Sequence, residues 1–303
     1  MREPYPLALI PLIPQFLTRR RAKADFPLRA MERFGLDRPS YFFALDLGIQ
    51  DPRGGRPQDI GNATYRTTDQ PLRATAAASE SAGLIAWADG RWSLTDKGRV
   101  ALDEFRRAID AHYSSLSPIA ADELERLADL LDQSLRAAST SAEPKTREHT
   151  PRAARYRWQE PSSAMARLDV AIFGLWQVRD DCHVQAWRDA GVAGPALDVL
   201  TKLWRNEAKT VEELSGAARP EADTRAALQQ LRDAGLAAPG TNRADQADRA
   251  DQAGLVLTAK GTGTRERIEA ETDRYFFAPW PDSVGAKADW IVDRLGAVNA
   301  ALA

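Results

Sequence analysis

The chain has 303 residues, a formal net charge of −2 and one cysteine, Cys182. Its 44% hydrophobic and 28% charged residues are typical of a folded protein with one or two cores. The near-neutral charge excludes a bulk attraction to nucleic acid or to an anionic membrane, and the lone cysteine excludes an intrachain disulfide. We therefore expect a cytoplasmic protein that makes no contact with membranes.

The N-terminal arm, residues 1–24, is apolar and rich in proline before a basic cluster at Arg19, Arg20, Arg21 and Lys23. An export signal has its basic residues before the apolar run, and prolines would break its helix. We therefore expect an arm that is ordered or docked on the protein. Its basic cluster either flanks DNA or keeps the arm solvated.

Residues 25–138 predict a set of helices around one hairpin. An apolar helix follows Gly35 and Pro39, a short helix is expected over 57–66, and a longer helix over 68–84 ends at Gly83 in the left-handed conformation. The stretch 85–95 predicts two strands around a loop, and a long helix follows over 99–113. After a break at Pro118, the last helix carries a stripe of Leu124, Leu127, Leu131 and Leu135. This order predicts a winged helix.

Residues 164–303 repeat this pattern after a polar, proline-punctuated linker at 139–163. The segment 25–48 aligns without a gap on 181–204, and Leu94-Thr95-Asp96-Lys97-Gly98 recurs as Leu257-Thr258-Ala259-Lys260-Gly261. The second copy is about eleven residues longer before this last motif, where a six-residue unit, Arg-Ala-Asp-Gln-Ala-Asp, is nearly duplicated over 243–254. We therefore place a polar insert at the tip of the second wing.

The final helices of the two copies predict how the copies pack. The second carries an apolar stripe of Val284, Ala288, Ile291, Leu295 and Val298, which matches the leucine stripe of the first. We expect a mainly α protein with small β-wings. Its two tandem winged-helix units, 25–138 and 164–303, would form an intramolecular pseudo-dimer through 99–138 and 264–302.

Two motifs carry a resemblance to known regulators. Asp89-Gly90-Arg91 and Leu94-Thr95-Asp96-Lys97-Gly98 are similar to the wing and turn of MarR-type regulators, and 179–191 with 257–280 also resembles actinobacterial helix-turn-helix proteins labelled SalK-like. The resemblance covers most of 25–138 and 165–302. MarR-type regulators are homodimers of one such unit. The resemblance therefore implies a ligand-responsive transcriptional regulator, either a monomeric pseudo-dimer or a homodimer.

Double-stranded DNA is the partner that this resemblance implies. Phosphates require cations, and base edges require forked donors. The candidate DNA-binding residues are Arg66, Thr67, Thr68, Gln70, Arg73, Arg91, Arg219, Thr224, Arg225 and Gln229. Acidic residues oppose them, so that 57–85 and 209–233 each carry a net charge of −1. An alternative is therefore a small-molecule-binding protein or a secondary-metabolism enzyme on a winged-helix scaffold that no longer binds DNA.

The second copy also holds candidates for a small-molecule site. Aromatic stripes are usually core, but MarR-type regulators bind ligands in a cleft equivalent to the one expected here. The candidate residues for a small aromatic or apolar ligand are His183, Trp187, Trp204, Tyr275, Phe276 and Trp280. His183 would transfer protons if the protein is an enzyme.

No other pattern in the sequence indicates a reaction or a cofactor. The chain has no cysteine and histidine set with metal spacing and no glycine-rich phosphate loop, so we expect neither a metal nor a cofactor. Cys182 is expected to be a small buried residue, because Asp180 and Asp181 would raise the pKa of its thiol.

Overall fold

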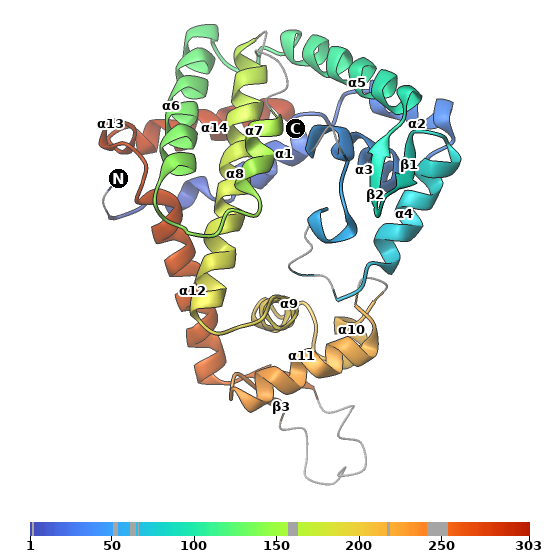
Figure 1. Ribbon diagram of the computed structural model, residues 1–303. Coiled ribbons are helices and arrows are strands. Elements are labelled where there is room, and N and C mark those ends of the chain that lie inside the picture. The colour runs from blue at the N-terminus through green and yellow to red at the C-terminus, as the bar shows by residue number, and fades with distance from the viewer. Residues whose placement is uncertain are drawn as a thin grey trace. The chain divides into compact units, whose positions relative to one another are not determined.

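The computed structural model is mainly helical, with two small two-stranded antiparallel sheets, as the sequence predicts (Figure 1). It describes residues 1, 3–50, 54–60, 65, 67–156, 163–216, 219–240 and 254–303. These residues form two compact units. Unit 1 comprises 1–56, 75–182 and 273–303, and unit 2 comprises 57–74 and 183–272.

Most helices belong to unit 1. Its elements are η1 (Leu7–Leu9), α1 (Leu12–Arg19), α2 (Phe26–Phe34), α3 (Arg38–Gln50), β1 (Ile85–Ala88), β2 (Arg91–Leu94), α5 (Asp96–Ser114), α6 (Ala121–Thr140), α7 (Thr150–Tyr156), α13 (Asp282–Gly285) and α14 (Ala288–Leu302). Unit 2 contains η2 (Pro57–Asp59), α9 (Gly194–Trp204), α10 (Val211–Leu214), α11 (Glu221–Asp233), β3 (Ala237–Pro239) and β4 (Leu255–Leu257). Helices α4 (Gln70–Ser81), α8 (Ala164–Asp189) and α12 (Ala259–Phe277) contribute residues to both units.

The same order of elements occurs twice along the chain. The first series consists of α3, the short η2, α4, the hairpin β1–β2 and the long α5. The second series consists of α9, α10, α11, the pair β3–β4 and α12. Gly83 and Gly235 end α4 and α11 with φ of 72° and 68°, which confirms their predicted left-handed role. The polar insert lies outside the described residues, which resume at Gly254.

The repeated Leu-Thr-x-Lys-Gly motif makes matching hydrogen bonds in each unit. In unit 1 the Thr95 hydroxyl accepts from Gly98 N at 3.0 Å and donates to the carbonyl of Gly83 at 2.6 Å. In unit 2 the Thr258 hydroxyl accepts from Gly261 N at 3.0 Å and donates to the carbonyl of Gly235 at 2.7 Å. Each threonine caps its long helix and ties it to the end of the preceding one.

The glycine of this motif is required by a close approach of backbone. A Cβ on Gly98 would lie 2.0 Å from the carbonyl oxygen of Leu84, and a Cβ on Gly261 would lie 2.0 Å from that of Leu236. Gly98→Ala is therefore expected to lower the free energy of unfolding by about 1–3 kcal/mol, measured by urea denaturation.

Gly296→Ala is the matched control for this substitution. Gly296 lies in α14 with open space at its Cβ position, so alanine should raise stability by about 0.5–1 kcal/mol. A Gly98→Ala variant as stable as the wild type would contradict the close approach.

The terminal helices α6 and α14 pack on each other within unit 1 (Figure 1). The predicted stripe residues Leu127, Leu131, Ile291 and Leu295 are all buried, at 0–1% exposure. At the edge of this contact Arg294 pairs with Glu123 at 2.8 Å. The predicted burial of these four residues is confirmed.

The N-terminal arm is docked within the same unit, as expected. Helix α1 contacts α14, and Ile13 and Phe16 of α1 are buried. The side chain of Asn299 in α14 donates to the carbonyl of Leu12 at 2.9 Å. The arm therefore contributes to the core of unit 1.

The segment predicted as a linker, 139–163, contains a further element, α7, which contacts α3. Its start is fixed by the buried carboxylate of Asp181. The backbone N–H groups of Glu148, His149 and Thr150 donate to this carboxylate at 2.8 Å each, and the Thr150 hydroxyl donates at 2.6 Å. Part of the expected linker is thus folded onto unit 1.

Candidate functional site

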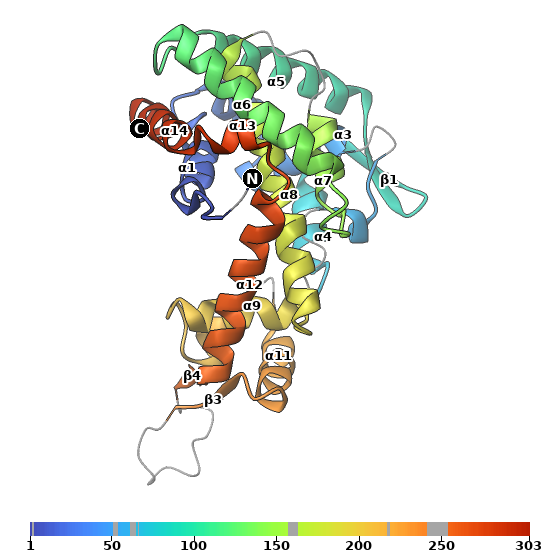
Figure 2. The same cartoon turned by 90° about the vertical axis from the view of Figure 1, so that its left-hand side faces the viewer.

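Unit 2 contains a helix-turn-helix formed by α10 and α11, and α11 packs against α9 (Figure 2). A capping box starts α10, because Glu213 N donates to the Thr210 hydroxyl at 3.2 Å and Thr210 N donates to the Glu213 carboxylate at 3.1 Å. The turn is closed by the Ser215 hydroxyl, which donates to that of Thr224 at 3.0 Å. The hydroxyl contact between Ser215 and Thr224 therefore holds α11 against the end of α10.

The solvent-facing side of α11 carries two of the predicted DNA-binding residues. Arg225 and Gln229 are exposed, one turn apart. Arg225 pairs with Glu221 at 2.7 Å, and the Gln229 amide donates to Asp233 at 2.7 Å. Both side chains are therefore accessible but already engaged with acidic neighbours.

Two other predicted DNA-binding residues of unit 2 do not face solvent, which corrects the sequence assignment. Thr224 is fully buried and donates to the carbonyl of Pro220 at 3.3 Å. Arg219 is 8% exposed and pairs with Asp198 of α9 at 2.6 Å. Both residues hold the turn and α11 in place.

The first series of repeated elements includes α4 and the hairpin β1–β2. Gln70 and Arg73 are exposed on α4, Thr67 and Thr68 are half-buried before it, and Arg66 lies outside the described residues.

The hairpin turns at Asp89 and Gly90, which both have positive φ, and Arg91 begins the returning strand. Trp92 of this strand donates to the Glu80 carboxylate of α4 at 2.8 Å, so the hairpin is tied to α4.

His183 and Trp187, two of the predicted ligand residues, lie in unit 2 and each contacts another residue of that unit. The Thr272 hydroxyl donates to the carbonyl of Ile268 at 2.7 Å, so His183 Nδ1, at 3.1 Å, donates to this hydroxyl. Trp187 is buried against Tyr65, with ring centroids 6.2 Å apart.

Trp204 in the same unit is 39% exposed, and the guanidinium of Arg265 lies 5.1 Å from its ring centroid. Arg265 itself is almost fully buried and pairs with Glu269 at 2.5 Å.

The other predicted ligand residues belong to unit 1. Phe276 and Trp280 are buried with centroids 5.3 Å apart, and Tyr275 is half-buried beneath the guanidinium of Arg274. The six predicted ligand residues are therefore divided between the two compact units, so that one cleft lined by all of them would have to include residues of both. That cleft stays a prediction.

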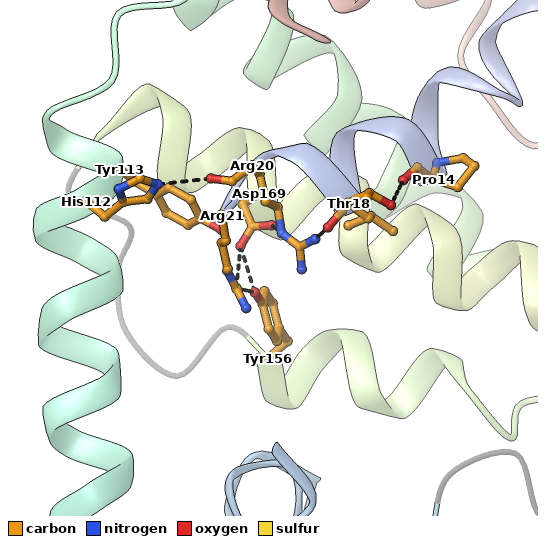
Figure 3. Close-up of polar contacts among 9 residues, drawn as sticks. Pro14, Thr18, Arg20, Arg21, His112, Tyr113, Tyr156 and Asp169 are labelled. Carbon is orange, nitrogen blue, oxygen red and sulfur yellow. Dashed lines mark hydrogen bonds and ion pairs between the residues drawn. The ribbon is translucent and has the colours of Figure 1, made fainter. Parts of the chain in front are cut away.

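Unit 1 holds a buried charge cluster at the end of α1 (Figure 3). Arg20 pairs with Asp169 of α8 at 2.5 Å, and Arg21 contacts the same carboxylate at 3.3 Å. Arg21 also donates to the hydroxyls of Tyr113, at 2.8 Å, and Tyr156, while the Tyr156 hydroxyl donates to Asp169 at 2.7 Å. Two guanidiniums therefore share one carboxylate away from bulk water.

The cluster shifts the proton affinities of its members. Burial would raise the pKa of Asp169, but the Arg20 and Arg21 guanidiniums and the tyrosine hydrogen bonds reverse this and lower it. Burial also raises the pKa of Tyr156 to about 12. At neutral pH the cluster therefore holds two positive charges, one negative charge and neutral tyrosines.

The sequence did not predict this role for the basic cluster of the arm. The alternatives were DNA contact or solvation, and both are wrong for Arg20 and Arg21, which are mostly buried. One signal was present in the sequence. Asp169 is a lone acid in the apolar run 168–178, and a charge in such a run requires a buried partner.

Cys182 is fully buried in α8, as expected. Burial, and then the neighbouring Asp181, raise the pKa of its thiol well above the ordinary value. The thiol is therefore neutral and unreactive. Among the described residues, no group of three or more histidine, cysteine, aspartate or glutamate side chains is placed to hold a metal ion.

Two helices joined by a fixed turn, followed by a small antiparallel sheet, define a helix-turn-helix protein. Residues 135–303, more than half of the chain, match the model of a helix-turn-helix family, and the chain belongs to that family. No curated protein and no solved structure matches the chain. No helix in the described part of the chain is long and apolar enough to cross a membrane.

Proposed function

We propose that the protein is a ligand-responsive, DNA-binding transcriptional regulator of MarR-like type, built from two tandem winged-helix units that form a pseudo-dimer within one chain. The observation that carries this proposal is the repeated element order with its matching Thr-Gly hydrogen bonds, of which the second copy falls inside the helix-turn-helix family match. A family built on this motif points to DNA as the partner. The packing of α6 on α14 supports the pseudo-dimer, because MarR-type units dimerise through their terminal helices.

In this function α4 and α11 are the recognition helices. Arg73 and Gln70 of α4, together with Arg225 and Gln229 of α11, offer exposed guanidinium and amide donors to base edges and phosphates. Arg91, at the start of the returning strand of the first hairpin, would contact a phosphate.

One observation favours a second candidate, a winged-helix scaffold that binds a small molecule without DNA. On α11 the acids Glu221, Asp223 and Asp233 outnumber Arg225 and Arg232, and Glu221 already pairs with Arg225. Such a face would repel phosphates, because DNA affinity depends on neutralising them.

A gel shift with DNA flanking the protein's own gene separates the two candidates. The regulator should give a sequence-specific shift that weakens steeply with salt. Arg225→Ala should weaken that shift about tenfold, since a bidentate arginine contact contributes roughly 1–3 kcal/mol of discrimination.

Arg107→Ala is the control, because Arg107 is an exposed arginine on α5 and belongs to neither recognition helix. It should leave the shift unchanged. A wild-type protein that gives no shift at low salt would exclude the regulator and favour the scaffold.

A further inference from the structure

Unit 1 contains a cavity of about 860 Å³ where the end of the arm meets α2 and α3. Its lining is apolar except for Thr18 and three arginines, Arg20, Arg21 and Arg38. None of the described residues that line it is acidic. A cavity of this volume matches those that hold small organic molecules, which are mostly apolar with a few polar groups.

The charge beside this cavity is unbalanced. Asp169 is the single carboxylate within ion-pair distance of Arg20 and Arg21 among the described residues, so the buried cluster carries one excess positive charge. Asp169 and the hydroxyls of Tyr113 and Tyr156 hold the two guanidiniums in their charged form, and a bound anion would balance the excess charge.

A third cation lies at the same cavity. Arg38 is exposed in the first turn of the 13-residue helix α3, with its guanidinium 5.7 Å from the ring centroid of Phe42. No carboxylate of the described residues is within ion-pair distance of it.

We propose that this cavity binds a small organic acid, whose carboxylate pairs with the arginines and whose apolar body packs on Leu28, Met31 and Phe42. A guanidinium matches a planar carboxylate with two parallel hydrogen bonds, and the apolar lining favours an acid with a hydrocarbon body over a free inorganic anion. The organic acid would be the effector of the regulator proposed above. Only this role as an effector rests on the proposed function, because the binding itself does not involve DNA.

The test uses the full chain and no DNA. The anionic fluorophore 1-anilinonaphthalene-8-sulfonate is titrated into the protein, and 4-phenylbutyrate, its neutral amide 4-phenylbutyramide and inorganic phosphate are added as competitors. Saturable binding is expected, with displacement by the acid at a concentration at least tenfold lower than by the amide. Phosphate should displace the fluorophore no better than the amide.

Two variants locate the site, and one controls for charge. Arg38→Gln should weaken fluorophore binding about five- to tenfold, and Leu28→Asp, at a side chain that is 58% exposed, should abolish it by placing a negative charge in the lining. Arg107→Gln removes the same charge from α5 and should change nothing. Arg38→Gln and Leu28→Asp replace exposed side chains, so the thermal unfolding of each variant should match that of the wild type.

The proposal is overturned by wild-type protein that does not bind the fluorophore, by equal displacement with the acid and the amide, or by unchanged binding in Arg38→Gln and Leu28→Asp. Displacement by phosphate alone would mean a simple anion site and would also overturn it. Because the titration contains no DNA, its failure is independent of the gel shift that tests the proposed function.

Discussion

Leu131→Asp is expected to unfold the chain. Leu131 is 1% exposed in α6, in the contact with α14, and aspartate there would be a buried charge without a partner. The lost apolar burial alone costs about 2–5 kcal/mol, and the unpaired charge adds several more, which together approach the total stability of an ordinary domain. Circular dichroism should show a loss of helix at 25 °C or a melting temperature lowered by more than ten degrees.

Gln133→Asp provides the control for this change, since Gln133 is exposed on the same helix. It introduces the same side chain without burial and should leave the melting temperature within a few degrees of the wild type. If Leu131→Asp melted like Gln133→Asp, the packing of α6 on α14 would be wrong.

Asp181→Ala is expected to lower the free energy of unfolding by about 3–5 kcal/mol. The substitution removes the acceptor of three backbone N–H groups, of the Thr150 hydroxyl and of His149 Nδ1, and it leaves these donors unsatisfied at the start of α7. Hydrogen exchange should increase in 148–156 before it increases in α6. Asp189→Ala is the control. Asp189 is the exposed last residue of α8, the helix that carries Asp181, and its replacement should cost less than about 0.5 kcal/mol.

The pH dependence of this difference provides a further check. Burial would raise the pKa of Asp181, but hydrogen bonds from His149 and Thr150 lower it below the ordinary value. A carboxyl group with a lowered pKa stabilises the fold fully above its unfolded pKa, and that contribution is lost as the pH falls through the folded pKa. The difference between wild type and Asp181→Ala should therefore stay constant from pH 7 to 5 and shrink only below about pH 4. A constant difference down to pH 2 would exclude the ionised carboxylate as its source.

The helices and the repeat could be predicted because their signals are local. Apolar spacing marked α6 and α14, and the glycines at 83 and 235 marked helix ends that have the expected positive φ. The matched motifs at Gly98 and Gly261 could be found by comparing the chain with itself. Each of these signals lies within a few residues of the feature it predicts.

The buried polar contacts could not be predicted in the same way, because their partners are far apart in the sequence. Arg21 and Asp169 are separated by 148 positions, and Thr150 is capped by a residue 31 positions later. Arg219 and Thr224 were assigned to a DNA surface by residue type, whereas burial assigns them to the turn. Composition identifies a residue that can bind DNA, but packing decides whether it is accessible.

The order in which the chain visits its two compact units limits how the protein can be divided. The backbone leaves unit 1 after Arg56, returns at Thr75, leaves again after Cys182 and returns at Asp273. No contiguous fragment therefore contains either unit complete without part of the other, and expression of 135–303 alone would truncate both. A gene fusion that exchanged one half of the chain for the corresponding half of a relative would break both cores. Neither half can therefore be exchanged as an independent domain.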